Sequence, residues 1–266
     1  MDLLQVFWLG MVQGLTEFLP VSSSGHLVLL QKLFGIRNDS IALEVLLHVG
    51  TLLAVVFVYW KRILNMILHP NFKHPLQSEL CLLVFATIPA AICAFTIDFS
   101  EAFSGEFLGF SFLITTLILW LADLVSGMSF ETKEVKWYNA LVMGLLQAVA
   151  ILPGVSRSGS TISGGIATGL SRKRAADFAF LMSIPAILGS IVISAKDIID
   201  GKAADVAGGP MAMLFGVVVS AVFGFLAIKF MLKIVRRMRL PWFGLYTGIL
   251  GVLILLDQYV FHYVFQ

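Results

Sequence analysis

Two polar segments carry the side chains of this 266-residue chain that are best suited to chemistry. In the first, Gln13 and Glu17 are four residues apart and therefore share one face of a helix. Glu17 precedes the sequence Leu-Pro-Val-Ser-Ser-Ser-Gly-His at 19–26, which ends on His26. A carboxylate can hold a divalent cation through oxygen, and an imidazole can move protons near neutral pH or attack a substrate directly.

The second segment, Leu-Pro-Gly-Val-Ser-Arg-Ser-Gly-Ser at 152–160, contributes Arg157 with a serine on each side. A planar guanidinium suits phosphate oxygens, and serine hydroxyls or backbone N–H groups at a helix N-terminus can cradle an anion. Because Glu17, His26 and Arg157 stand between apolar runs, each would be costly to bury without a function. These groups together predict a site for a phosphate-bearing ligand.

Other polar residues have structural interpretations as well. Ser24, Ser158 and Ser163 lie among small residues of the kind that pack helices closely, and this alternative stays open for them. Glu44 and His48, four apart on the next element, either support the site or, in the case of Glu44, mark a helix start near the membrane interface. The residues expected to be interfacial or structural are Asp123, Asp177, Lys229 and Asp257, and the two cysteines Cys81 and Cys93.

The composition determines the class of protein that must position these groups. Hydrophobic residues make up 59% of the chain and charged residues 13%, and the mean hydropathy is +0.94. Soluble domains carry roughly 25% charged residues. A soluble globular enzyme, a disordered chain and a nucleic-acid binder are therefore excluded, and the chain is expected in a bilayer.

Apolar runs predict the elements. Six are long enough to cross about 30 Å of hydrocarbon, at approximately 41–60, 80–98, 107–125, 175–195, 211–232 and 242–264. Four others are short or interrupted, at 3–19, 25–36, 137–152 and 160–170. Pro, Gly and Ser break the helix in the middle of each short pair, and such backbone survives at membrane depth only inside protein or beside a watery cavity. We therefore predict two re-entrant helical hairpins.

The two halves of the chain resemble each other. Gln13 and Gln147 each precede a break, and Val-Ser-Ser-Ser-Gly in the first half matches Val-Ser-Arg-Ser-Gly in the second. Each half holds one hairpin and three crossings, so the second half must be inverted relative to the first. The predicted fold is a single all-α polytopic membrane domain over 1–266, with two inverted-topology repeats at about 1–126 and 137–266.

Lys and Arg residues predict the orientation. One face receives Lys61, Arg62, Lys73, Lys133, Lys136, Arg172, Lys173, Arg174, Lys233, Arg236, Arg237 and Arg239. The other receives only Lys32, Arg37, Lys196 and Lys202. The positive-inside rule makes the first face cytoplasmic. Both termini are then outside, and the hairpins enter from opposite faces.

The motifs at 13–26 and 152–161 resemble those of the bacterial undecaprenyl-diphosphatases, the bacitracin-resistance family of integral membrane phosphatases, and the resemblance covers essentially the whole chain. The family's Glu/Gln-x-x-x-Glu motif falls on Gln13 and Glu17, and Gln13 leaves Glu17 as the sole acid there. Its other motif residues fall on Ser22, Ser23, His26, Pro153, Gly154, Ser156, Arg157, Ser158 and Thr161.

The resemblance implies hydrolysis of undecaprenyl diphosphate to undecaprenyl phosphate and inorganic phosphate. This reaction recycles the lipid carrier of cell-wall synthesis and gives bacitracin resistance, and its active site faces the outer side of the bacterial plasma (inner) membrane. The implied cofactor is a divalent cation, Mg²⁺ or Ca²⁺, held by Glu17 and Gln13. The residues that would clamp the phosphates are Arg157, Ser22, Ser156, Ser158 and Thr161.

Three questions stay open at this level. The nucleophile is either Ser23 activated by His26, which we favour, or His26 itself. A transporter or flippase for a polyprenyl phosphate lipid has the same architecture and would need a similar phosphate clamp. A purely structural membrane scaffold is a third interpretation, but it would not explain why Glu17 and Arg157 are buried. The expected partners are the lipid substrate and membrane lipid, with no nucleic acid, and the choice between monomer and homodimer is undecided.

Overall fold

The structure, a computed structural model, describes residues 2–36, 41–97, 105–126, 132, 134–199, 209–235 and 239–265. Within these residues the chain is helical apart from turns and one isolated β-bridge between Thr132 and Leu170. The α-helices are α1 (Leu3–Phe18), α2 (Ser23–Leu33), α3 (Ile41–Leu68), α4 (Glu79–Thr96), α5 (Leu108–Ser126), α6 (Trp137–Val149), α7 (Arg157–Ala167), α8 (Arg172–Ile199), α9 (Gly209–Ile234) and α10 (Pro241–Leu256). Two short elements are η1 (Pro75–Gln77) and the π-helical η3 (Asp257–Phe261).

Six of the described helices are long and apolar enough to cross a membrane, which confirms the predicted spans. They cover Leu43–Leu68, Glu79–Thr96, Leu108–Ser126, Arg172–Val192, Gly209–Ile234 and Pro241–Phe261. The first continues beyond its predicted end at residue 60. The last is α-helical only to Leu256, because the Asp257 carboxylate accepts backbone N–H bonds from residues 263–265 and turns the chain back.

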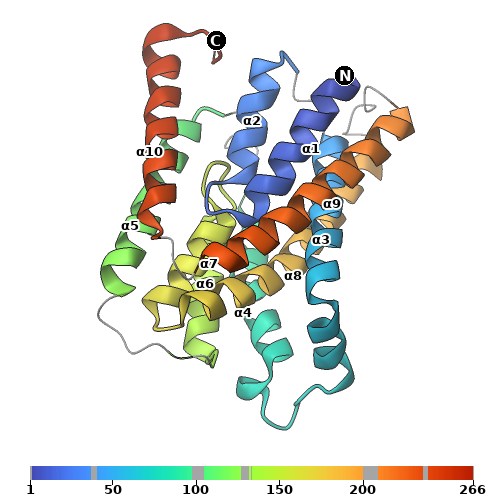
Figure 1. The fold of residues 1–266 in the computed structure, drawn as a ribbon, viewed down its shortest axis with the longest axis vertical. Helices are drawn as coiled ribbons and strands as arrows, with labels where there is room; N and C mark the ends of the chain where they lie inside the picture. Colours follow the sequence, from blue (N-terminus) through green and yellow to red (C-terminus); the bar gives the residue numbers. More distant parts are fainter. Residues whose placement is uncertain are drawn as a thin grey trace.

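Two pairs of short helices occupy opposite parts of the bundle (Figure 1). α1 and α2 pack together at the end of the molecule where both chain termini lie, and the turn that joins them points toward the middle. α6 and α7 pack together in the other half, and the segment that joins them also points toward the middle. These are the four short apolar stretches predicted from the sequence. The helices are interrupted at residues 19–22 and 150–156, whereas the later residues of both polar segments begin α2 and α7.

Small residues let the short helices pack so closely that their backbones contact the backbones of neighbouring helices. A methyl group on Gly14 of α1 would lie 2.7 Å from the carbonyl oxygen of Ser220 on α9. A methyl group on Gly144 of α6 would overlap the carbonyl oxygen of Ala86 on α4. Such contacts are typical of helix packing in membranes, where close van der Waals contact replaces the hydrophobic driving force. They position α1 and α6, which carry Gln13 and Gln147.

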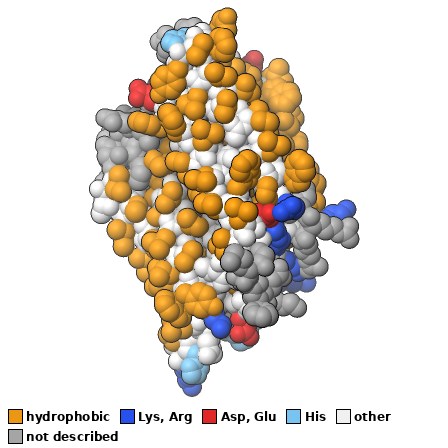
Figure 2. All heavy atoms as spheres, turned by 90° about the vertical axis from the view of Figure 1, so that its left-hand side faces the viewer, with side chains coloured by type: hydrophobic (Ala, Val, Ile, Leu, Met, Phe, Trp, Pro, Cys, Tyr) orange, Lys and Arg blue, Asp and Glu red, His pale blue; other side chains and the backbone are white. Residues whose placement is uncertain are grey.

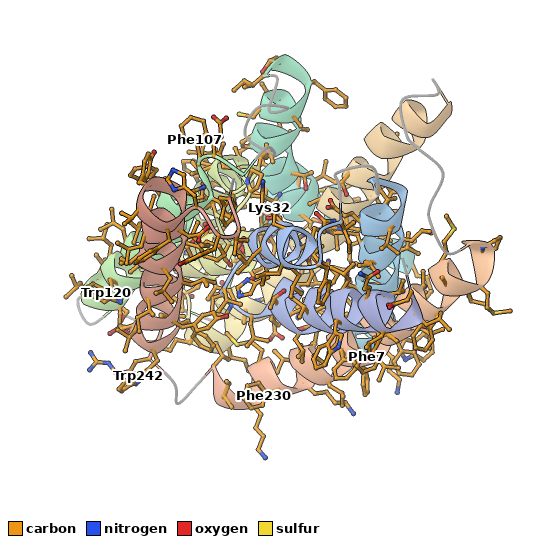
Figure 3. The ribbon with its side chains drawn as sticks, turned by 90° about the horizontal axis from the view of Figure 1, so that it is seen from above. Phe7, Lys32, Phe107, Trp120, Phe230 and Trp242 are labelled. Carbon is orange, nitrogen blue, oxygen red and sulfur yellow. The ribbon has the colours of Figure 1, made fainter. Side chains whose placement is uncertain are left out.

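Apolar side chains fill the interior and also cover the outside. Phe18 of α1 packs edge-on against Phe180 of α8, with ring centroids 5.5 Å apart. Figure 2 shows hydrophobic side chains over most of one face, with Lys and Arg toward its lower half. Seen from above, Trp120, Phe230 and Trp242 lie on the outer rim (Figure 3), and each is about half exposed or more. An exterior of this kind suits contact with lipid.

Arginine clusters hold two carboxylates near the ends of spans. Each carboxylate binds two guanidinium groups, so that neither acid is buried unpaired. Glu79 accepts hydrogen bonds from Arg62 and Arg174, and Asp123 accepts them from Arg172 and Arg239. The first set of pairs joins α3, α4 and α8, and the second joins α5, α8 and the segment just before α10.

Candidate active site

The first helix break holds an unusual backbone conformation at Ser22. α1 ends because Leu19 is extended before Pro20, which cannot donate a backbone hydrogen bond. Ser22 has φ of 72°, a left-handed value that is uncommon outside glycine. Its hydroxyl accepts the Gly25 N–H at 3.2 Å and caps α2, and its carbonyl bonds the His26 ring at 2.6 Å. These contacts stabilise the strained turn.

The second break uses a glycine for the same purpose. Gly154 has φ of +93°, and a methyl group on it would lie 2.6 Å from Cβ of Ser111. Ser156 then caps α7 by accepting the Gly159 N–H at 3.0 Å. Thr115 of α5 clamps the break from outside, since its hydroxyl accepts the Ser156 N–H and donates to the Gly154 carbonyl, both at 2.9 Å.

The two breaks meet inside the bundle. The hydroxyl of Ser158, in the first turn of α7, donates to the carbonyl of Leu19 in the first break at 2.7 Å. A methyl group on Gly25 would lie 2.9 Å from Cα of Gly154. The N-termini of α2 and α7 therefore share one region of the interior, and both present the positive end of a helix dipole to it.

We expect Gly25→Ala to destabilise the protein by about 1–3 kcal/mol, because the added methyl group would meet both Phe112 and Gly154 closer than 3 Å. A matched control is Gly189→Ala on α8, where a methyl group meets nothing within 4 Å. Thermal melts in detergent check both variants. An unchanged melting temperature for Gly25→Ala would mean that the two breaks are loosely packed against each other.

Glu17 lies at the centre of the polar contacts between the breaks. Its side chain is 4% exposed, and its Oε1 accepts an N–H from Nη2 of Arg157. Its Oε2 accepts the Ser23 hydroxyl at 2.5 Å and the Gln13 amide at 3.0 Å. The guanidinium of Arg157 is also held from the other side, where Nη1 donates to the carbonyl of Ser183 on α8 at 3.3 Å. The structure thus brings together an acid, a hydroxyl and a guanidinium from both halves of the chain.

His26 has different partners from those expected of a base for Ser23. Its Nδ1 donates to the Ser22 carbonyl, and its Nε2 accepts the Tyr246 hydroxyl of α10 at 2.7 Å. The imidazole stacks on the Tyr246 ring with an interplanar angle of 10° and meets Phe112 edge-on. Ser23 donates to Glu17 instead. The expected pairing of Ser23 with His26 is therefore replaced by pairing of Ser23 with Glu17.

The other predicted phosphate ligands use their hydroxyls to hold the backbone. Ser22 and Ser156 cap the two helices, Ser158 binds Leu19, and the Thr161 hydroxyl donates to the carbonyl of Arg157 at 2.8 Å. In this arrangement these residues shape the two breaks and orient Arg157. Thr115 and Tyr246 also contact residues of the two breaks, but the sequence analysis did not predict them as site residues. Each is a polar residue inside a predicted membrane span, and that position could have identified it.

The oxygen atoms around Glu17 suit a hard cation. Among the described residues no group of three or more His, Cys, Asp and Glu could hold a metal ion. Gln13 nevertheless buries its Oε1 atom beside Glu17 without a hydrogen-bond partner. A Mg²⁺-type site commonly takes one or two protein oxygens and completes its shell with substrate phosphates and water. Gln13 and Glu17 fit that requirement.

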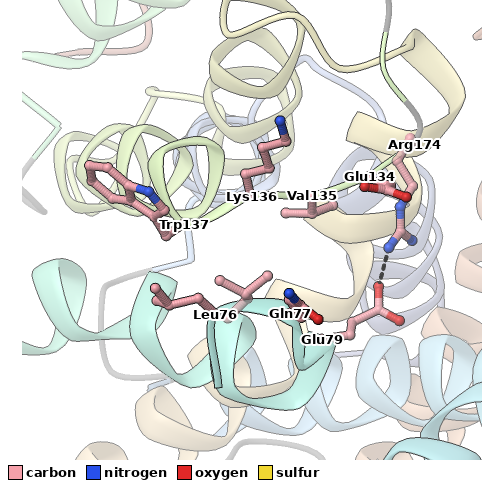
Figure 4. Close-up of a pocket in the computed structure, with 9 residues that line it drawn as sticks. Leu76, Gln77, Glu79, Glu134, Val135, Lys136, Trp137 and Arg174 are labelled. Carbon is pink, nitrogen blue, oxygen red and sulfur yellow. Dashed lines mark hydrogen bonds and ion pairs between the residues drawn. The ribbon is translucent and has the colours of Figure 1, made fainter. Parts of the chain in front are cut away.

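A separate cavity of about 620 Å³ lies at the starts of α4 and α6. Figure 4 shows Arg174 bonded to Glu79 at its wall, with Glu134 beside them and Trp137 at the opposite side. None of the residues at the helix breaks lines it. This cavity is therefore distinct from the site around Glu17.

Six span-length apolar helices and a buried carboxylate–guanidinium pair between two helix breaks define a multi-pass membrane protein with an internal polar site. Residues 6–253 match the family described as bacitracin resistance protein BacA. The chain belongs to this family.

Curated relatives align over almost the entire chain. An undecaprenyl-diphosphatase of Carboxydothermus hydrogenoformans is 42% identical over 261 residues, which cover 97% of this chain and 98% of the relative. An undecaprenyl-diphosphatase of Halothermothrix orenii is 37% identical over 264 residues, which cover 98% of this chain and 100% of the relative. A third undecaprenyl-diphosphatase, of Methanosphaera stadtmanae, is 35% identical over 276 residues, which cover 95% of this chain and 97% of the relative.

Proposed function

We propose that this chain hydrolyses undecaprenyl diphosphate to undecaprenyl phosphate and inorganic phosphate, and so recycles the lipid carrier of cell-wall synthesis. The observation that carries the proposal is the convergence of two helix N-termini on the cluster of Glu17, Ser23 and Arg157. Positive helix ends and a guanidinium favour the binding of a phosphate, and a hydroxyl oriented by a carboxylate can act as the nucleophile. The names of the relatives support the same substrate.

In the proposed reaction Ser23 attacks the terminal phosphorus. The Ser23 Oγ–P bond forms, the bond from phosphorus to the bridging oxygen breaks, and undecaprenyl phosphate leaves. Oε2 of Glu17 accepts the Ser23 hydroxyl at 2.5 Å and orients it, and the Ser23 proton passes to a non-bridging oxygen of the transferred phosphate. Water then hydrolyses the phosphoserine and releases inorganic phosphate. Arg157 binds the phosphate oxygens through its remaining N–H groups and stabilises the charge that shifts onto them. Direct attack by Nε2 of His26 is the alternative.

Glu17 and Gln13 would hold the divalent cation, Mg²⁺ or Ca²⁺. When bound, the cation would neutralise charge on the phosphate oxygens. The carboxylate of Glu17 also keeps Arg157 in place before the substrate binds, through the pair that joins the two halves of the chain.

We also propose that the fold consists of two inverted repeats, each with a re-entrant hairpin. The equivalent caps support this: Ser22 and Ser156 each accept an N–H from the glycine three residues later. The packing is also exchanged between the halves, because α1 packs on α9 whereas α6 packs on α4. Helix breaks that enter from opposite sides and meet centrally are a known transporter architecture.

For the orientation we propose a cytoplasmic face at the α3–α4 connection and outside termini, with the active site open to the outer side of the plasma membrane. Lys61, Arg62 and Lys73 lie at or near that connection. Several charges used in the sequence argument, Arg37, Lys133, Lys202, Arg236 and Arg237, lie outside the described residues.

Single cysteine reporters test this orientation in a background without Cys81 and Cys93. A reporter at Lys73, an exposed residue between α3 and α4, should be shielded from an impermeant thiol reagent in whole cells. A reporter at Tyr263, which is 80% exposed near the C-terminus, should react. Permeabilised cells provide the control, since both reporters should then be labelled. The reverse pattern would overturn the orientation.

Phosphate release from a C55 lipid diphosphate by the purified protein tests the proposed function. We expect release with added Mg²⁺ or Ca²⁺ and loss of release with a chelator. Lipid movement across vesicles without phosphate release would instead favour the transporter or flippase interpretation. That alternative has its own support in the two helix pairs that meet at the centre of the bundle.

A further inference from the structure

The two oxygens of Glu17 face different surroundings. Oε1 faces the guanidinium of Arg157, which would compete with a cation. Oε2 faces side chains from α1, α2 and α3. Two of them have lone pairs that could bind a metal, the Ser23 hydroxyl at 2.5 Å and Nε2 of His48 at 3.9 Å. The third, the Gln13 amide, donates an N–H from its Nε2 to Oε2 at 3.0 Å and carries its ligand oxygen, Oε1, on the same group.

His48 is oriented as a metal-binding histidine would be. Its Nδ1 lies 2.8 Å from the backbone carbonyl of Glu44, which can only accept a hydrogen bond, so Nδ1 carries the proton. A metal-binding ring in this orientation would present the lone pair of Nε2 toward Glu17. Histidines that bind metals usually donate their other ring N–H to a carbonyl or carboxylate in this way.

The distance between His48 and Glu17 also suits a shared ion. At 3.9 Å, Nε2 and Oε2 are too far apart for a direct hydrogen bond. Two ligands of one cation with bonds of about 2.1 Å lie about 3–4 Å apart. The helix segment that carries His48 is tied to α2, because Gln31 donates to the Glu44 carboxylate at 2.7 Å.

A second observation points to a ligand at the same place. The side chain of Gln13 is 0% exposed, and its Oε1 atom has no hydrogen-bond partner in the described part of the chain. Burying an amide oxygen without a partner is costly. A cation bound by Glu17 and His48 would satisfy this atom if the Gln13 amide turned its oxygen, in place of its nitrogen, toward Glu17.

We propose that His48 is a ligand of the divalent cation, together with Glu17 and Gln13, and that the substrate phosphates and water complete its shell. This inference rests on the proposed function for the presence of a cation. It adds a residue, His48, that would determine which divalent cation binds most tightly. One nitrogen among oxygen ligands favours Mn²⁺ over Mg²⁺ and Ca²⁺, which prefer oxygen. The site should therefore bind Mn²⁺ most tightly of the three ions.

Mn²⁺ binding to the full-length purified protein, followed by pulsed electron paramagnetic resonance, tests the proposal. The wild type should show nitrogen modulation from a bound imidazole, and labelling with ¹⁵N-histidine should convert the ¹⁴N signal to ¹⁵N. His48→Gln should lose this signal and bind Mn²⁺ at least about tenfold more weakly, with a smaller change for Mg²⁺. His69→Gln, at an exposed residue just after α3, is the matched control and should behave as wild type.

Three results would overturn the inference: bound Mn²⁺ without histidine modulation, modulation that survives in His48→Gln, or no binding of Mn²⁺ to the substrate-free protein. The labelled wild type needs no variant, so the test stands even if His48→Gln does not fold. Failure of the proposed function would be seen separately, as absence of cation-dependent phosphate release from the lipid diphosphate.

Discussion

Arg157→Lys is expected to lose at least about a hundredfold in turnover while the protein still folds. The guanidinium donates to Glu17 through Nη2 and to the Ser183 carbonyl through Nη1, so it is held from two sides. Lysine keeps the charge but offers a compact donor on a flexible stem, without two parallel N–H groups for two phosphate oxygens. Losing one pre-aimed donor in such a site costs on the order of 3–4 kcal/mol, or about 10²–10³ in turnover.

The measurement is the initial rate at saturating lipid diphosphate, with folding checked by a thermal melt in detergent. Arg172→Lys is a matched control, because its side chain is 21% exposed against 18% for Arg157 and also pairs with a buried acid, Asp123. It should keep most of the turnover. If Arg157→Lys retains more than about a third of the wild-type rate, Arg157 is a generic counter-charge and the clamp is wrong.

Ser23→Ala should lower turnover by at least about 10³-fold, because it removes the proposed nucleophile. His26→Gln should be less damaging, since His26 bonds Ser22 and Tyr246 rather than Ser23. The control is Ser24→Ala, next to Ser23 on α2, whose hydroxyl makes only a 3.4 Å contact with Ser22. Initial rates for the three variants provide the comparison.

Acid-quench trapping separates the two candidate nucleophiles directly. Attack by Ser23 predicts an acid-stable phosphoserine in the wild type and no phosphoenzyme in Ser23→Ala. Attack by His26 predicts an acid-labile phosphohistidine that persists in Ser23→Ala together with measurable activity. Trapped phosphohistidine would end the preference for Ser23. It would assign Nε2 of His26, which is hydrogen-bonded to the Tyr246 hydroxyl in this structure, as the attacking atom.

Features set by local sequence could be predicted without the structure. Six apolar runs of span length became six helices that are long enough to cross a membrane, because length and hydropathy are properties of contiguous residues. Both helix breaks followed from Pro, Gly and Ser between apolar stretches. The four-residue spacing of Gln13 and Glu17 put their side chains in contact, at 3.0 Å, because a helix brings such positions onto one face.

The choice of partners across helices was decided only by tertiary structure. Ser23 is six residues from Glu17, its acceptor, and Tyr246 is 220 residues from His26, and neither pairing follows from helix periodicity. They depend on how the α1–α2 turn folds back and on where α10 packs, which in turn depend on close contacts at small residues throughout the bundle. The sequence by itself therefore determined which chemical groups are present and that they are buried, whereas only packing between distant segments decided which atom of each group faces which partner.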